Sequence, residues 1–324
     1  MNGKSVRRAC AAVCAISSIA WAVQAEAAAS PPMAFNWGEH LEAGVKAVET
    51  KTSAGQQIQL EATYSLCARR TAKGYEIGFA NLLVMVAGKR MPDQLARTMA
   101  ITGGLVPYAN ISSAGKFEGL RGFEQIQAHV REVYRQKIPP GADPEATERA
   151  LAQMTTRQYQ EANATESWQS LVGTWAGLTL APGGTMKTHS RHQTIFGLPI
   201  AHDITLSYPT REACTSGAAM KDCARLHSIS ESDPHAFDAT IEKLRAQAQR
   251  PKGEIPLGTH LRDEVDLITE PATLRPHSAR WSRTLSVTTG DKEHPTAKQQ
   301  SDTTTMSFEY TPQAACKSGK EMAP

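Results

Sequence analysis

The chain has 324 residues, and its 35 Lys and Arg nearly balance its 32 Asp and Glu. Residues 1–25 carry three basic residues and no acidic one, so the rest of the chain has 32 charged residues of each sign. Proteins that bind nucleic acid need a basic surface to neutralise phosphates, so this composition excludes a nucleic-acid-binding function.

Residues 1–25 have the pattern of a cleavable secretory signal peptide. Basic residues precede an uncharged run, Ala9 to Val23, and small residues follow it. That run is shorter than the ~20 residues that span a bilayer, and no later stretch comes closer. We therefore expect a periplasmic or secreted protein with no transmembrane span after cleavage. Three cleavage positions fit the pattern: Ala25, Ala27 and Ala29.

Four cysteines remain after cleavage: Cys67, Cys214, Cys223 and Cys316. An even number of cysteines in an exported chain predicts disulfides, with three pairings open. Cys214 and Cys223 flank a turn-like stretch, which favours a local bridge and leaves Cys67 to pair with Cys316. No Cys-x-x-Cys spacing occurs, so disulfides are favoured over a metal site and no metal is expected.

The first part of the chain is expected to form strands. Residues 26–56 are predicted to hold an N-terminal lead-in and a first strand, with 30–39 as a loose segment. From Gln57 to Arg69 apolar and polar residues alternate strictly, which indicates an antiparallel strand with one wet face. A turn at 72–74 then leads to a more apolar strand at Tyr75–Val86.

Helical patterns follow a hairpin expected at 106–120. Apolar residues recur at helical spacing within 123–134, and Asp143-Pro144 supplies an N-cap and a first-turn proline for a second helix. A third helix is expected over 168–175, and a fourth after Asp233. Further strands are expected at 186–195, 202–208, 224–230, 264–269, 281–288 and 303–310.

These elements predict an α+β fold, in which a curved antiparallel sheet has one face covered by amphipathic helices. Residues 57–312 are expected to form one domain, with a sub-boundary near 182 as the alternative, and 313–324 a C-terminal tail. Six aromatic residues are expected to face the space between sheet and helices, where they either fill a core or line an apolar cleft: Trp168, Trp175, Tyr75, Phe79, Trp281 and Phe308.

No spacing typical of a nucleotide-binding loop or of a serine-hydrolase elbow occurs, so no cofactor is expected. The densest histidine cluster holds His189, His192 and His202, with Asp203 beside them. Residues three apart in a strand point to opposite faces, which argues against a metal site here.

Three functional hypotheses remain open. The first is a non-catalytic protein that binds an apolar ligand or an envelope partner. The second is an envelope hydrolase that uses the histidine cluster with Asp203. The third is a structural or assembly subunit of an envelope complex.

Overall fold

The computed structural model describes residues 30–53, 55–102, 109–136, 143, 145, 148, 151–152, 155–193, 199–214, 222–233, 235, 242, 258–290, 295–310 and 316. The predicted signal peptide with its cleavage positions, most of the helix expected after Asp233 and most of the tail 313–324 lie outside these residues.

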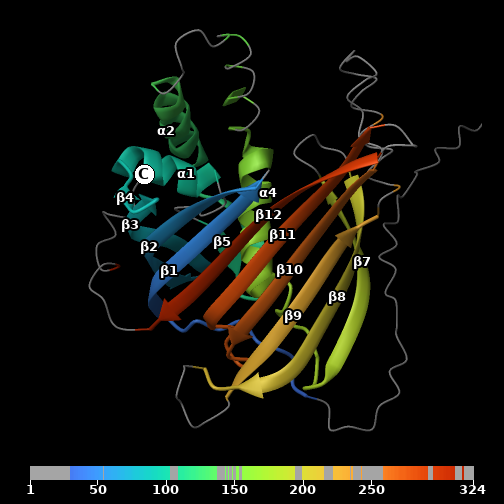
Figure 1. Cartoon of the computed structure of the whole chain (residues 1–324). Coiled ribbons are helices and arrows are strands. Elements are labelled where there is room, and N and C mark those ends of the chain that lie inside the picture. The colour runs from blue at the N-terminus through green and yellow to red at the C-terminus, as the bar shows by residue number, and fades with distance from the viewer. Residues whose placement is uncertain are drawn as a thin grey trace, which may run out of the picture.

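The described chain is built around one antiparallel sheet of twelve strands (Figure 1). Its order is β6-β5-β3-β2-β1-β12-β11-β10-β9-β8-β7, and β4 pairs with β3. Most strands pair with the strand before or after them in the chain. The exceptions are β5, which pairs with β3, and β12, which returns to lie beside β1, while β6 and β7 form the two edges of the sheet. The strands are β1 (His40–Ser53), β2 (Gln56–Thr71), β3 (Gly74–Val86), β4 (Lys89–Arg90), β5 (Ala109–Ser112), β6 (Phe117–Leu120), β7 (Gly184–Gln193), β8 (Pro199–Glu212), β9 (Cys223–Ser232), β10 (Gly258–Thr269), β11 (Pro276–Gly290) and β12 (Pro295–Glu309).

The predicted α+β fold is wrong, because the described chain is mostly β. Its helices are three short ones, α1 (Asp93–Thr102), α2 (Phe123–Arg135) and α4 (Arg157–Trp168), and a π-helical turn, η1 (Gln169–Gly173). The strands extend well beyond the apolar alternation that predicted them. β12, for example, begins at Pro295, eight residues before the expected start, in polar sequence that pairs fully with β11.

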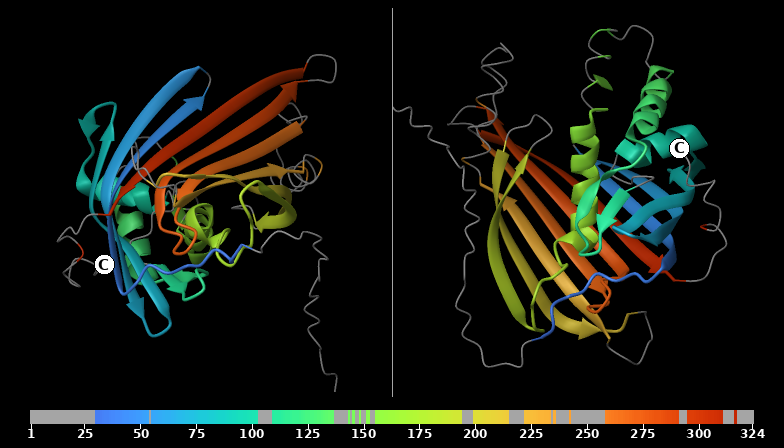
Figure 2. Two further views of the ribbon diagram at one scale, coloured as in Figure 1. Left: turned by 90° about the horizontal axis from the view of Figure 1, so that it is seen from below. Right: turned by 180° about the vertical axis from the view of Figure 1, so that it is seen from behind.

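The helices also do not form a layer over one sheet face. The chain leaves the sheet at β6, one edge, and re-enters it at β7, the other edge, so the intervening residues must pass across the sheet. Figure 2 shows α4 lying inside the curve of the sheet. In contrast, α1 packs against β3 and α2 against α1.

The segment 30–39, expected to be loose, is instead part of the core. Met33, Phe35 and Trp37 are 2%, 8% and 1% exposed. The backbone of the same segment is tied to distant turns, because Ala34 N donates to Pro271 O (3.0 Å) and Asn36 N donates to Thr273 O (3.1 Å). Every second residue of 33–37 is large, apolar and buried, and burial of these three side chains fixes the segment.

The expected disulfide bonds are present. Cys67 on β2 is joined to Cys316, and Cys214 after β8 is joined to Cys223 at the start of β9. The first bridge links positions 249 residues apart and the second only 9. Both are consistent with a protein that folds in an oxidising environment.

Candidate functional site

An aromatic cluster lies between α4 and the sheet. The Trp168 ring, at the end of α4, meets Phe35 and Trp37 edge-on, with each pair of ring centroids 5.5 Å apart. Phe35 also contacts Tyr75 of β3 at 5.0 Å. Tilted and edge-to-face arrangements at these distances are favourable beyond the area they bury. The cluster therefore packs the helix and the N-terminal segment together against the sheet.

A pocket remains beside this cluster. Its volume is about 90 Å³, its walls are almost entirely apolar, and it is bounded by the sheet on one side and by α4 and η1 on the other. Ser167 of α4 is exposed and marks the solvent side of the pocket. The lining residues are Trp37, Tyr64, Leu66, Ile77, Gly78, Ala109, Ile111, Phe117, Ala164, Ser167, Trp168, Leu171, Pro276 and Phe308.

Tyr64 carries the one ionisable side chain on the pocket wall. Burial raises the pKa of its phenol well above the usual value of about 10. The hydroxyl therefore stays neutral at physiological pH, and the pocket presents no charge to a ligand.

Polar contacts hold α4 onto the sheet at the edge of the pocket. Arg283 of β11 forms ion pairs with Glu166 of α4 and with Asp263 of β10, the latter at 2.7 Å. Burial disfavours the charge on Arg283, but hydrogen bonds and attraction from Asp263 and Glu166 together outweigh it, so the pKa of the guanidinium is raised. Its side chain also lies over the Trp281 ring, 4.9 Å from the centroid.

A second polar contact joins α4 to the β5–β6 turn. Trp168 Nε1 donates to Gly115 O at 2.7 Å. Gly115 has φ of +83°, and a Cβ there would approach Phe35 and Ala176 to 3.0 Å. This turn therefore requires glycine, both for its left-handed backbone and for the close packing beneath α4.

The structure separates the six aromatic residues predicted for the cleft. Only Trp168 and Phe308 line the pocket. The side chains of Trp175, Tyr75 and Phe79 are 1%, 4% and 9% exposed and belong to the packed core, while Trp281 is partly buried against it.

Sequence reasoning missed three aromatic residues of the pocket wall, Trp37, Tyr64 and Phe117, and also Phe35 of the aromatic cluster. Phe35 and Trp37 lie in the segment that was expected to be loose. The signal that marks them is local: Met33, Phe35 and Trp37 are large apolar residues at every second position, the period of an extended segment with one buried side. Their place became apparent only from contacts with the turn around Pro271 and Thr273.

The structure brings part of the histidine cluster together. His189 of β7 lies opposite Asp203 of β8, and His189 Nδ1 is 2.6 Å from Asp203 Oδ1. Both side chains are about four-fifths exposed (83% and 79%), so water competes with this pair and it stabilises the fold little. They border an open depression of about 620 Å³ together with Ser190, Ala201, Glu231, Ser232, Asp233 and His260.

Of the other two histidines in the predicted cluster, His202 does not join that pair. His202 precedes Asp203 in β8, so its side chain lies on the opposite face; it is 5% exposed, with Nδ1 3.1 Å from Ser230 Oγ. The side chain of His192 lies outside the described part of the structure. The hydrolase hypothesis remains a hypothesis, and it would rest on an exposed His189–Asp203 pair.

No protein-family model matches the chain, and a search of curated proteins finds no similar sequence. Among the helices of the described residues, none combines the length and the apolar character required to cross a membrane.

Proposed function

We propose that the protein is exported to the periplasm or secreted, and that it binds a small apolar ligand, or the apolar end of a larger one, without catalysis. The observation that carries this proposal is the apolar pocket between the curved sheet and α4. A sheet–helix interior lined by apolar side chains is the usual setting for a hydrophobic ligand.

Export is supported by two independent features. The first 25 residues have the order of charge, apolar run and small residues of a secretory signal. The two disulfides fit the oxidising compartment to which such a signal leads.

The size of the pocket limits the ligand. A cavity of about 150 Å³ in another protein takes up benzene, and this pocket of about 90 Å³ is smaller. It accommodates about three groups of methylene size, such as the end of an acyl chain, while the rest of a longer ligand lies outside. Burial of three methylenes contributes about 2.4 kcal/mol to binding, at about 0.8 kcal/mol each.

The absence of catalysis is supported by the lining residues. The hydroxyls on the pocket wall are those of Tyr64 and Ser167. Neither is activated, because the lining residues include no histidine or carboxylate that could take up a proton.

The proposal is tested by blocking the pocket from its solvent side. Ser167→Trp places a bulky ring at the exposed edge of the pocket, and Ala162→Trp adds the same ring at an exposed position of α4 that does not line it. Binding of a medium-chain fatty acid brominated near its methyl end is followed by quenching of tryptophan fluorescence.

We expect Ser167→Trp to weaken binding about 50-fold, the equivalent of about 2.4 kcal/mol, and Ala162→Trp to leave it unchanged. Equal affinity in the two variants would place the ligand elsewhere, and the lack of any saturable quenching in the unmodified protein would refute the proposal.

A further inference from the structure

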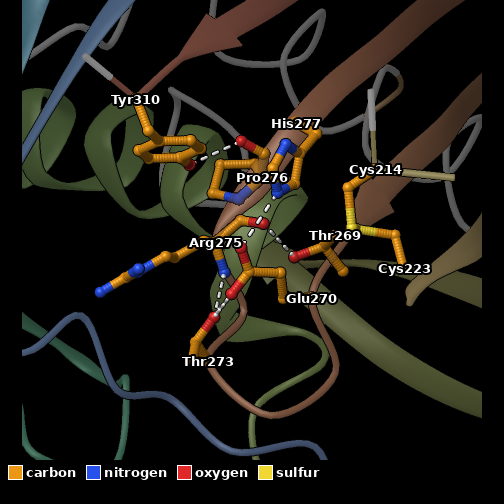
Figure 3. Close-up of a disulfide and its surroundings, with 9 residues drawn as sticks. All are labelled: Cys214, Cys223, Thr269, Glu270, Thr273, Arg275, Pro276, His277 and Tyr310. Atoms are coloured by element: carbon orange, nitrogen blue, oxygen red, sulfur yellow. Dashed lines mark hydrogen bonds and ion pairs between the residues drawn. A yellow bond between two sulfur atoms is a disulfide. The ribbon is translucent and has the colours of Figure 1, made fainter. Parts of the chain in front are cut away.

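The short disulfide lies beside a histidine from another part of the chain. The sulfurs of Cys214 and Cys223 and a ring nitrogen of His277 all lie within 4.8 Å of one another (Figure 3). Among the described residues this is the only group of three or more cysteine, histidine or carboxylate side chains that converges closely enough to hold one metal ion.

A β-bulge aims His277 at this position. Thr269 of β10 pairs with Pro276 of β11, but the next residue back, Ile268, pairs with Ser278, so His277 is the extra residue of the bulge. Bulges re-aim a side chain out of the regular alternation of a strand and are common beside functional sites. The same Thr269 also pairs with Ala224 of β9, the strand on the other side of β10, and Ala224 follows Cys223 in the sequence. The bulge and the cysteine are thus brought together across three neighbouring strands.

The ring of His277 is held by its neighbours. Nε2 lies 3.1 Å from Glu270 Oε1, and the other oxygen of Glu270 accepts a hydrogen bond from Thr273 Oγ1 at 2.6 Å. Tyr310 packs edge-on against the imidazole, with ring centroids 5.3 Å apart, and donates its hydroxyl to Pro276 O. A carboxylate can only accept, so Nε2 carries the hydrogen of the neutral ring.

This arrangement leaves one ring nitrogen of His277 without a partner. Nδ1 is buried and has no hydrogen-bond partner. In the neutral ring with hydrogen on Nε2, Nδ1 keeps its lone pair. A histidine whose other nitrogen is bound by a carboxylate is the usual form of a metal-ligating histidine, because the carboxylate fixes the tautomer and makes the ring more basic.

We propose that Cys214 and Cys223 in their reduced state form, together with His277, a binding site for one Zn²⁺ ion. Two thiolates and an imidazole are the ligands that zinc prefers, and three protein ligands leave a fourth position open. Cys214 is partly exposed, so the site can be reached from solvent, whereas Cys223 is fully buried.

The site forms in two balanced steps. A dithiol reductant transfers two electrons and two protons to the Cys214–Cys223 bond, which becomes two thiols while the reductant becomes a disulfide. Zn²⁺ then displaces the two thiol protons, which leave to solvent. The sulfurs separate from bonding contact to about 3.8 Å, the spacing of two tetrahedral ligands at about 2.3 Å from zinc. Zinc binding and the disulfide therefore exclude each other.

The experiment uses the whole mature protein, reduced without denaturant and freed of reductant under nitrogen. Co²⁺ is titrated as a spectroscopic probe of the zinc site, and Zn²⁺ is then added in competition with a chromophoric chelator. We expect one Co²⁺ per chain, with thiolate-to-cobalt charge-transfer absorption that Zn²⁺ abolishes, and no such absorption in the oxidised protein.

Variants separate this site from other ligands. Glu270→Gln should weaken zinc binding by 10- to 100-fold, as for other partners of ligating histidines, and His277→Ala by at least as much. His189→Ala, an exposed histidine of the same sheet, serves as the matched control and should bind normally. Circular dichroism of each reduced protein confirms that it is folded.

Two results would overturn the proposal. One is a reduced, folded protein that shows no thiolate-to-cobalt absorption. The other is a zinc affinity that is the same in His277→Ala as in the unmodified chain. Because neither measurement involves the apolar pocket, failure here is distinguishable from failure of the proposed ligand binding.

Discussion

The two disulfides should contribute unequally to stability, because they close loops of very different length. The bridge from Cys67 to Cys316 closes a loop of 249 residues and that from Cys214 to Cys223 one of 9. In the chain-entropy model, removing the long bridge costs about 5.5 kcal/mol at 25 °C and removing the short one about 2.6 kcal/mol. The difference, about 2.9 kcal/mol, depends only on the ratio of the loop lengths.

The test compares two double variants, Cys67→Ala with Cys316→Ala, and Cys214→Ala with Cys223→Ala. Equilibrium unfolding in guanidinium chloride is followed by tryptophan fluorescence, to which the Trp37–Trp168 cluster is sensitive. Residual structure in the denatured chain lowers both losses, so the comparison of the two variants is sharper than either value alone. If the long-bridge variant lost no more unfolding free energy than the short-bridge variant, the entropic reasoning would be refuted.

Two further predictions concern charged groups. Arg283→Met leaves the partly buried Asp263 and the half-exposed Glu166 without their cation, so it should lower the unfolding free energy by about 1–3 kcal/mol. Arg280→Met, exposed on the same strand, should change it by less than about 0.5 kcal/mol, and similar losses in both variants would contradict the role of Arg283. Burial and the charge of Arg97 lower the pKa of His129 in the folded protein. Between that lowered pKa and the unfolded-state value of about 6.5, the unfolded chain binds more protons than the folded one. The unfolding free energy therefore falls as the pH falls through this window. His129→Gln should reduce that fall in unfolding measurements at pH 7.5 and 5.5, and an unchanged slope would refute the assignment.

The sequence predicted best what is decided locally. The strict alternation after Gln57 corresponds to β2, and the turn at 72–74 leads into β3 as expected. However, alternation does not show which part of a strand is buried by other elements. Ile58 is one of the apolar residues of the alternation that were expected to face the core. It is nevertheless 54% exposed, where it pairs with Lys51 near the end of the β1–β2 hairpin. Period alone therefore predicts the strand but not its burial.

The extent of the sheet could not be predicted, because it depends on pairing between distant segments. The first half of β12 is polar, and what makes it a strand is its register against β11, from Ser286 opposite Gln299 to Gly290 opposite Pro295. The link between β1 and β12, Gly44 opposite Glu309, likewise joins the two ends of the chain. Helical segments were recognised more readily than these polar strands, which is why the expected fold contained too much helix.

The zinc-site proposal depends on the same kind of long-range information. Cysteine spacing alone argued against a metal, since the chain has no Cys-x-x-Cys pattern. The third ligand, His277, lies on β11, two strands away from Cys223 on β9. In a regular ladder Pro276 and His277 would lie opposite Thr269 and Ile268, and their side chains would alternate between the two faces. The bulge inserts one residue and removes His277 from that alternation. A single inserted residue thus decides whether an imidazole faces the two sulfurs, and no motif of fixed spacing could reveal it.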